Sequence, residues 1–191
     1  MSSPTRLVIF GRQGAGKGTQ CVRLVEKYGV QHISTGDMLR GAVAAGTEMG
    51  LKAKAVMDAG NLVGDDIING IVRERLAADD IAEHGFVLDG YPRTVAQAEA
   101  LVQILGDDSL HCVVDLDVPL DEVTERMKAR GRDDDTDEGI ARRLELYEQE
   151  TRPVLDWFAA RGLLIQVDGL ADEATVTERL FAAIDTAMAS A

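Results

Sequence analysis

A glycine-rich segment with a single lysine follows a short apolar run near the start of the chain. Residues 11–20 read Gly-Arg-Gln-Gly-Ala-Gly-Lys-Gly-Thr-Gln, directly after Leu7-Val8-Ile9-Phe10. Glycines let successive backbone N–H groups turn toward an anion, and a following helix adds its positive N-terminal end. Gly11, Gly16 and Lys17 fit the phosphate-loop pattern, although Gly18 follows the lysine and Thr19 comes one residue later. The segment therefore predicts a phosphate-binding loop for a nucleotide.

Two further clusters place arginines just after short apolar segments. Residues 32–40 read His-Ile-Ser-Thr-Gly-Asp-Met-Leu-Arg, and residues 85–97 carry Asp89, Arg93 and Gln97 behind the apolar run Phe-Val-Leu. Arg40 and Arg93 follow different predicted strands, so we expect them to grip one phosphate from two sides.

An aspartate at the end of a buried strand near a phosphate loop is suited to hold magnesium, directly or through water. Asp89 occupies such a position. Asp115 and Asp117 end another apolar run and are rivals for this role, but no glycine, turn and arginine follow them.

A third cluster lies between residues 126 and 143, where arginines surround the acidic run 133–138. The arginines are Arg126, Arg130, Arg132, Arg142 and Arg143. We interpret Arg142 as part of a solvated helix face and the acidic run as a polar helix start, because carboxylates favour helix N-termini. The histidines (His32, His84 and His111) show no metal-ligand spacing and are interpreted as structural or surface residues.

Composition restricts the partners and the compartment. The 191 residues are 46% hydrophobic and carry a formal net charge of −13, which argues against non-specific binding to nucleic acid or an anionic membrane. The first apolar run is too short for a signal peptide or a membrane span. Cys21 and Cys112 fit neither a disulfide framework nor a metal cluster and suggest buried thiols in a reducing compartment. We therefore expect a cytoplasmic location.

Short apolar runs alternate with amphipathic stretches along the whole chain. This alternation predicts one α/β domain with a parallel sheet covered on both faces, and ligands at the carboxyl ends of its strands. The predicted strands are 6–10, 31–34, 86–89, 112–118 and 163–167. The predicted helices are 17–28, 37–45, 49–59, 66–78, 94–105, 120–130, 138–160 and 172–188.

The glycine-rich segment 11–20 and the clusters at 32–40 and 85–94 resemble the adenylate kinase family in their order and spacing, and the resemblance covers essentially the whole chain. The resemblance implies an α/β P-loop three-layer sandwich with a five-stranded parallel sheet, a small AMP-binding helical segment and a short lid. It divides the chain into a core (1–33, 64–129 and 138–191), an AMP-binding segment (34–63) and a lid (130–137). It also implies a monomer that transfers the γ-phosphoryl group of MgATP reversibly to AMP, giving two ADP. The resemblance implies Mg²⁺ bound with ATP. No zinc is expected, because the short lid has no Cys or His.

The resemblance assigns roles residue by residue. Catalysis is expected from Lys17, Arg93, Arg130, Arg132 and Arg143. ATP is expected to contact Gly14, Ala15, Gly16, Lys17, Gly18, Thr19, Arg126, Arg130 and Gly169. AMP is expected to contact Thr35, Gly36, Arg40, Leu62, Val63, Gly90, Arg93, Gln97, Arg132 and Arg143. Asp89 is expected to hold Mg²⁺ through water.

Two alternatives remain beside this interpretation. UMP/CMP kinases share the loop and the arginines, but they resemble Ser-Ala-Gly where this chain has Ser34-Thr35-Gly36, and Asn where Gln97 stands; both differences favour AMP. A GTPase or ATPase module would also carry a phosphate loop, but the Asn-Lys-x-Asp pattern for guanine is absent and the acceptor arginines would have no use. The chain departs from its family at Gln13, where the phosphate loop usually carries proline.

Overall fold

Five parallel strands form the centre of the protein. The computed structural model describes residues 4–106, 110–132 and 135–190. The strands pair side by side in the order β2-β3-β1-β4-β5, and each pairing is parallel. Their bounds are β1 Thr5–Phe10, β2 Gln31–Ser34, β3 Gly85–Asp89, β4 Cys112–Asp117 and β5 Leu164–Asp168. The predicted strands and the parallel sheet are confirmed, with ends that differ by at most one residue.

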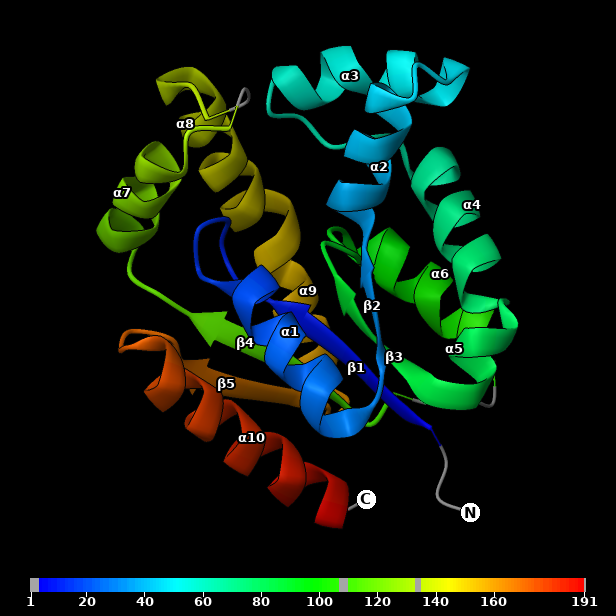
Figure 1. Cartoon of the computed structure of the whole chain (residues 1–191), viewed down its shortest axis with the longest axis vertical. Helices are drawn as coiled ribbons and strands as arrows, with labels where there is room; N and C mark the ends of the chain where they lie inside the picture. The colour runs from blue at the N-terminus through cyan, green and yellow to red at the C-terminus, as the bar shows by residue number, and fades with distance from the viewer. Residues whose placement is uncertain (1–3, 107–109, 133–134, 191) are drawn as a thin grey trace.

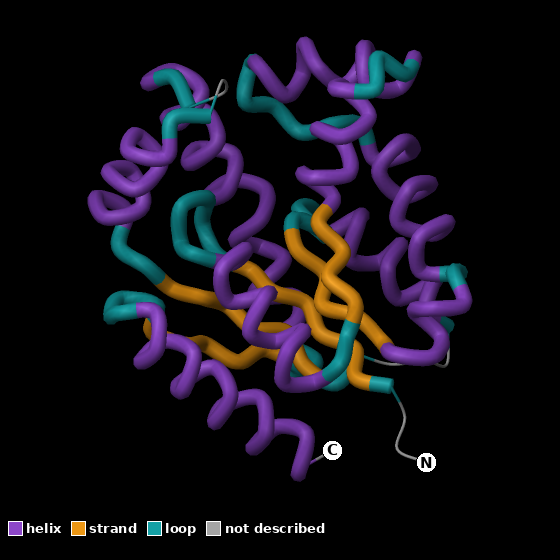
Figure 2. The backbone as a smooth tube through the Cα atoms, in the orientation of Figure 1, coloured by secondary structure: helices purple, strands orange, loops and turns teal. Residues whose placement is uncertain are grey.

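Helices cover both faces of this sheet (Figures 1 and 2). The strands bury nearly continuous apolar side chains, which is typical of a parallel sheet covered on both sides. Leu7 and Ile9 face the helices α1 (Lys17–Tyr28) and α10 (Glu173–Ser190), whereas Val8 and Phe10 face the opposite core. That core includes α4 (Asp65–Leu76), α6 (Val95–Leu105) and α9 (Arg152–Ala159). The three layers of the predicted sandwich are therefore present.

Two pairs of helices stand beyond the carboxyl ends of the strands, on either side of the phosphate loop (Figure 1). One pair is α2 (Thr35–Ala44) and α3 (Glu48–Asp58), which lie inside the predicted AMP-binding segment. The other is α7 (Leu120–Arg130) and α8 (Asp137–Leu146). The predicted lid, 130–137, is the connection between α7 and α8, and its residues 133–134 lie outside the described part of the chain. The division into core, segment and lid stays a prediction.

Two helical features were not predicted. A short helix, α5 (Asp79–His84), precedes β3. The stretch predicted as one helix over 138–160 consists of α8, a π-helical turn η1 (Tyr147–Thr151) and α9. Pro153 explains the wide turn, because proline has no N–H for the carbonyl four residues earlier and its ring crowds that carbonyl. The N–H of Arg152 donates instead to Tyr147 O, five residues back.

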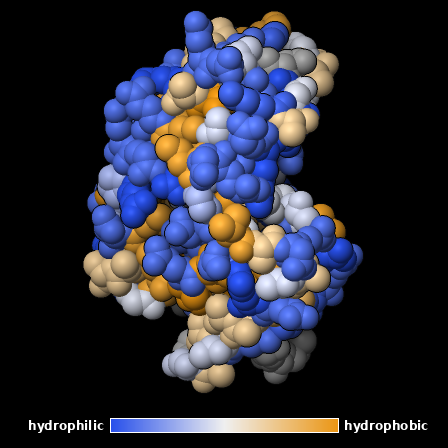
Figure 3. All heavy atoms as spheres, turned by 90° about the vertical axis from the view of Figure 1, so that its left-hand side faces the viewer, coloured by the Kyte–Doolittle hydropathy of each residue, from blue (hydrophilic) through white to orange (hydrophobic). Residues whose placement is uncertain are grey.

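The surface is mixed in hydropathy. The face that carries α7, α8 and α10 is mostly hydrophilic, with several groups of apolar residues between the hydrophilic ones (Figure 3). Cys21 and Cys112 are free and buried, as predicted. Among the described residues, no helix combines the length and the apolar character that a membrane crossing requires.

The phosphate loop begins with a tight turn directly after β1. The N–H of Ala15 donates to Arg12 O at 3.1 Å, and Gly14 has a φ of +84°. An i-to-i+3 bond with positive φ at the third residue defines a type II turn, whose second residue, here Gln13, has a φ that proline favours. Gly14 is required for a second reason, because a Cβ there would lie 2.6 Å from Val123 O.

This turn yields a prediction about Gln13. Gln13→Pro should melt above Gln13→Ala by about 1–4 °C in the absence of nucleotide, since proline removes about 0.4–1 kcal/mol of conformational freedom from the unfolded chain. The alanine variant is the matched control, because both variants lose the same side-chain contacts. Thermal unfolding of the two purified variants measures the difference. A lower melting temperature for proline than for alanine would contradict the turn assignment.

Candidate active site

The predicted site residues converge on one cavity of about 530 Å³ at the carboxyl ends of the strands. Its lining combines the phosphate loop, the ends of β2 and β3, the loop after α3, and side chains from α7, α8 and the connection between them. The predicted residues in this lining are Gly14, Gly16, Lys17, Gly18, Thr19, Thr35, Gly36, Arg40, Leu62, Val63, Asp89, Gly90, Arg93, Gln97, Arg126, Arg130, Arg132 and Arg143. Residues far apart in the sequence thus form a single cationic site.

Ala15 and Gly169 lie outside this lining. Ala15 is buried, and its N–H is used in the turn of the phosphate loop. The N–H of Gly169 donates to Asp117 O at 2.8 Å, and a Cβ at Gly169 would lie 2.7 Å from Val118 Cγ2. The backbone hydrogen bonds of both residues therefore stabilise the fold, and their contact with ATP stays a prediction.

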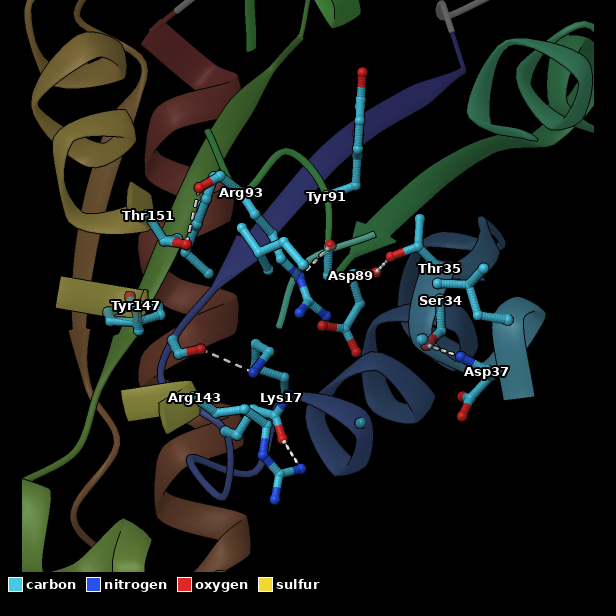
Figure 4. A pocket seen from close by; sticks show the side chains of 18 of the residues that line it. Lys17, Ser34, Thr35, Asp37, Asp89, Tyr91, Arg93, Arg143, Tyr147 and Thr151 are labelled. Atoms are coloured by element: carbon cyan, nitrogen blue, oxygen red, sulfur yellow. Dashed lines mark hydrogen bonds between the residues drawn. The ribbon is translucent and has the colours of Figure 1, made fainter. Parts of the chain in front are cut away.

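Lys17 is the cation of the phosphate loop. It begins α1, and its Nζ donates to Gly11 O at 2.8 Å and to Arg12 O at 3.2 Å (Figure 4). Burial lowers the pKa of the Lys17 ammonium, Asp89 raises it, and the balance lies below the usual value. The loop thus offers an ammonium beside the N-terminal end of a helix, an arrangement that attracts phosphate oxygens.

Asp89 ends β3 and points into the same space as Lys17 and Arg93 (Figure 4). Burial raises the pKa of Asp89, but His32, Lys17 and Arg93 together outweigh it, so that the pKa lies below its usual range. The carboxyl is therefore ionised at neutral pH. A charged carboxylate among cations, at the mouth of a phosphate loop, supplies the hard oxygen ligand that Mg²⁺ or its bound water accepts.

Gly90 lets two acceptor-side groups approach each other. A Cβ at Gly90, whose φ is +82°, would lie 2.8 Å from Thr35 Oγ1 and 3.2 Å from a terminal nitrogen of Arg93. Arg93 Nε donates to Gly90 O at 2.8 Å, and Thr151 Oγ1 donates to Arg93 O at 2.9 Å. The guanidinium of Arg93 is thus fixed through its Nε, and Arg93 lines the cavity.

Arg40 approaches the cavity from α2. Its guanidinium pairs with Asp37 and lies over Gly36, where a Cβ would come within 3.2 Å of it. Ser34 caps α2 by accepting from the N–H of Asp37, which fixes the helix that carries Arg40 (Figure 4). Arg40 and Arg93 therefore reach one cavity from different strand ends, as the sequence predicts.

Gln97 is buried, and both ends of its amide are engaged by the protein. Its Oε1 accepts from the N–H of Arg93 at 2.7 Å, and its Nε2 donates to Asp65 Oδ1 at 2.7 Å. An amide carries a second N–H and a second lone pair, so groups for a ligand remain. These two bonds fix which end of the amide faces which way.

Asp135 holds two arginines of the opposite wall. Arg130 donates to its carboxylate at 2.8 and 2.7 Å, and Arg143 donates to it at 2.9 Å. Burial raises the pKa of Asp135, but these bonds and the Arg132 N–H lower it more, so it lies well below its usual range. The sequence analysis interpreted Asp135 only as part of a polar helix start and missed this role, because position within an acidic run does not show which carboxylate turns inward.

The remaining arginines of this wall differ in their surroundings. Arg126 Nε donates to Glu122 at 2.7 Å, and Arg132 lines the cavity while its backbone N–H donates to Asp135. Arg142 is exposed, but its Nε donates to Asn61 Oδ1 at 3.0 Å. The prediction that Arg142 lies on a solvated helix face is confirmed, because Arg142 is exposed and absent from the cavity lining; it also contacts the loop after α3.

The structure also brings together Cys21, His32 and Asp89. Their possible ligand atoms all lie within 4.8 Å of one another, and His32 Nε2 lies 3.8 Å from Asp89 Oδ2. The sequence analysis considered these residues separately, because they come from α1, β2 and β3. Burial raises the pKa of the Cys21 thiol, so that this group stays protonated.

A parallel sheet with a phosphate loop after its first strand, and arginines facing that loop from two sides, defines a P-loop phosphotransferase. The sequence profile of the family described as adenylate kinase matches residues 9–163. The adenylate kinase of Stenotrophomonas maltophilia (strain R551-3) is 51% identical over 185 residues, covering 94% of this chain and 98% of the relative. That of Azorhizobium caulinodans is 50% identical over 194 residues, covering 95% and 100%. That of Nocardia farcinica is 50% identical over 184 residues, covering 94% and 98%. The chain belongs to the adenylate kinase family.

The two candidate metal carboxylates can be separated by substitution. Asp89→Asn should lower the kcat of Mg²⁺-dependent phosphoryl transfer by about 10–100-fold, the usual cost of removing a group that orients a metal shell. Steady-state kinetics at saturating Mg²⁺ measures the effect.

Asp115→Asn is the matched control. Asp115 is not part of the cavity lining. Tyr147 OH and Gln166 Nε2 each donate to its carboxylate at 3.4 Å. Burial is the main cause that raises the pKa of Asp115, so the ionised carboxylate destabilises the folded protein at pH 7. Asp115→Asn should therefore keep the wild-type kcat and have a higher melting temperature than the wild type at pH 7. This difference in melting temperature should vanish as the pH falls below about 4, the pKa of an aspartate in the unfolded chain, because Asp115 is then neutral in both the folded and the unfolded protein. If Asp115→Asn loses activity while Asp89→Asn stays active, Asp115 and not Asp89 is the carboxylate that holds magnesium.

Proposed function

We propose that this protein catalyses the adenylate kinase reaction, the reversible transfer of the ATP γ-phosphoryl group to AMP, giving two ADP. One observation carries the proposal. A single cavity is lined by two sets of anion-binding groups: the phosphate loop with Lys17, and Arg40 with Arg93 from the segments that follow β2 and β3. The Asp89 carboxylate lies beside Lys17 and Arg93 (Figure 4). An enzyme that only hydrolyses a nucleotide needs the first of these anion sites and not the second. The relatives named adenylate kinase support the same reaction.

On the donor side, the backbone of the phosphate loop and Lys17 bind the β- and γ-phosphates of ATP. Arg126, held by Glu122 at the cavity wall, packs on the adenine. A guanidinium plane that is fixed by a carboxylate offers a flat, cationic surface for an aromatic ring.

On the acceptor side, Arg40 and Arg93 bind the phosphate of AMP. Thr35, Leu62, Val63 and Gln97 surround its base, and Gly36 and Gly90 allow close approach. Gln97 is oriented by Asp65 and by the Arg93 backbone, which gives it a fixed donor and acceptor pattern toward a base. The family difference at Thr35 and Gln97 favours AMP over UMP or CMP.

Magnesium bound to ATP fits the donor set of this chain, because Asp89 offers an ionised oxygen ligand that lines the cavity. We assign Asp89 to hold Mg²⁺ through water. When bound, the ion neutralises phosphate charge between the two nucleotides. No zinc is part of the proposed reaction.

Arg130, Arg132 and Arg143 stabilise the transferring group. Phosphoryl transfer makes little covalent demand on the protein, so alignment and cancellation of charge on the equatorial oxygens carry most of the catalysis. These arginines line the same cavity as Lys17 and Arg93. Closure of the lid, 130–137, and of the AMP-binding segment, 34–63, excludes water, which would otherwise hydrolyse ATP.

The proposal includes a monomer that acts in the cytoplasm on ATP, AMP and ADP, with no nucleic acid or membrane as partner. Free, buried cysteines are typical of a reducing compartment, which supports this location. A formal net charge of −13 repels nucleic acid and anionic lipid, which supports small nucleotides as the partners.

A direct assay tests the reaction and its acceptor. We expect ADP formation from MgATP with AMP, and much slower formation with CMP, with UMP or without an acceptor. A bisubstrate dinucleotide, two adenosines joined by five phosphates, should inhibit the reaction and raise the melting temperature. Equal rates with UMP or CMP would reassign the acceptor, and ATP hydrolysis without an acceptor would replace the transferase by an ATPase.

Arg93→Ala tests the division of the cavity into two anion sites. The loss of an aligned, charge-assisted contact should lower transfer to AMP by about 100-fold or more, while ATP binding alone should barely change. Steady-state kinetics and a titration with ATP give the two quantities. Arg75→Ala is the control, because Arg75 pairs with Asp80 away from the cavity and its loss should leave both quantities unchanged. A loss of ATP affinity as large as the loss of turnover would place Arg93 on the donor side.

A further inference from the structure

The side chains of Arg12 and Gln13 reach from the phosphate loop to the helix that carries Arg143. Arg12 donates to Glu148 Oε1 at 2.9 and 2.7 Å and to Val118 O at 3.2 Å. Arg143 donates in the opposite direction, from one terminal nitrogen to Gln13 Oε1 at 2.9 Å (Figure 4). The phosphate loop is therefore connected to α8 and η1 by side chains, across 130 and 136 residues of sequence.

Gln13 and Asp135 bind the two ends of the same guanidinium. Asp135 accepts from the second terminal nitrogen of Arg143, and Gly139 O accepts from its Nε. Arg143 is among the most buried charged residues of the described chain, and these acceptors constrain the orientation of its guanidinium. The amide of Gln13 must present its oxygen, because a guanidinium has only donors.

The two acceptors differ in charge, and this difference matters for a group that is to meet phosphate. Asp135 neutralises Arg143, so a phosphate must compete with a carboxylate for that end of the fork. Gln13 is neutral, and it fixes the direction of the guanidinium without cancelling its charge. Gln13 also belongs to the loop that binds phosphate, so its contact places Arg143 relative to the loop itself.

We propose that Gln13 is a positioning residue for phosphoryl transfer, which aims Arg143 at the phosphates by accepting a hydrogen bond from it. This inference rests on the proposed function. Proline, which usually stands at this position of the family's phosphate loop, has no side-chain acceptor, so the contact is a property of this chain's own sequence.

A double-mutant cycle between Gln13 and Arg143 tests the inference. Gln13→Met keeps the length of the side chain and removes the acceptor, and it should lower kcat about 2–12-fold, the worth of one hydrogen bond, with little change in the KM for ATP or AMP. In an Arg143→Ala background the same change at position 13 should have no further effect on kcat. Gln149→Met is the matched control, because the amide of Gln149 donates to Glu145 on the exposed side of the helix.

Three outcomes would overturn the inference: an unchanged kcat in Gln13→Met, an equal loss in both backgrounds, or an equal loss in Gln149→Met. Gln13→Ala provides a second variant if the methionine variant does not fold, since a type II turn accepts most residues at this position.

A second readout does not depend on activity. The losses of melting temperature in Gln13→Met and Arg143→Ala should be smaller in combination than their sum, because both remove the same contact. Additive losses of melting temperature would show that the contact is absent in solution. A wild-type protein that is inactive with AMP would refute the proposed function. If the wild type is active but the effects of Gln13→Met and Arg143→Ala on kcat and on melting temperature are additive, only the role of Gln13 is refuted.

Discussion

Repulsion between like charges is the constraint around which this cleft is built. A lysine and several arginines line one cavity, and each would repel the others unless a carboxylate or a backbone carbonyl stood between them. Asp89 serves the phosphate-loop side, where Lys17 and Arg93 lie beside it. Asp135 serves the opposite wall, where it accepts from Arg130 and Arg143. These two carboxylates allow a dense set of cations to exist before any nucleotide arrives.

The same arrangement explains how an acidic protein binds acidic ligands. With a formal net charge of −13, the surface as a whole repels nucleotides. Attraction is therefore confined to the cavity, where the positive groups are concentrated at the carboxyl ends of the strands and at the start of α1. Such confinement favours small polyphosphates that fit inside over extended polyanions that would have to lie along the surface.

Much of the fold and the site could be predicted because the relevant signals are local in the sequence. A buried strand, a glycine turn and a cation come in sequence order at 7–17 and again at 86–93. Parallel connection then brings the ends of all strands to one edge, so Lys17, Asp89 and Arg93 had to meet. The helix at α2 was predicted, but its start was placed two residues late, at 37 instead of Thr35, because the capping role of Ser34 was not considered.

The features that the sequence did not predict depend on which way a side chain turns after the fold has formed. Asp135 is one carboxylate among neighbours of the same type, and only tertiary contacts turn it toward Arg143. Gln13 was considered for its backbone, and its amide acquires a partner only through a helix 130 residues away. Cys21 and His32 approach Asp89 across three separate elements, which no spacing along the chain can show.

The π-helical turn η1 sets the angular register of the helix on which Arg143 lies. An extra residue in one turn rotates everything before it by about 100° relative to everything after it. Phe158 in α9 is packed fully into the core, so the carboxyl half of this helix has no freedom to rotate. The orientation of Arg143 toward the phosphate loop is therefore fixed by the widened turn at 147–151. An uninterrupted α-helix over the same residues would aim that guanidinium away from Gln13.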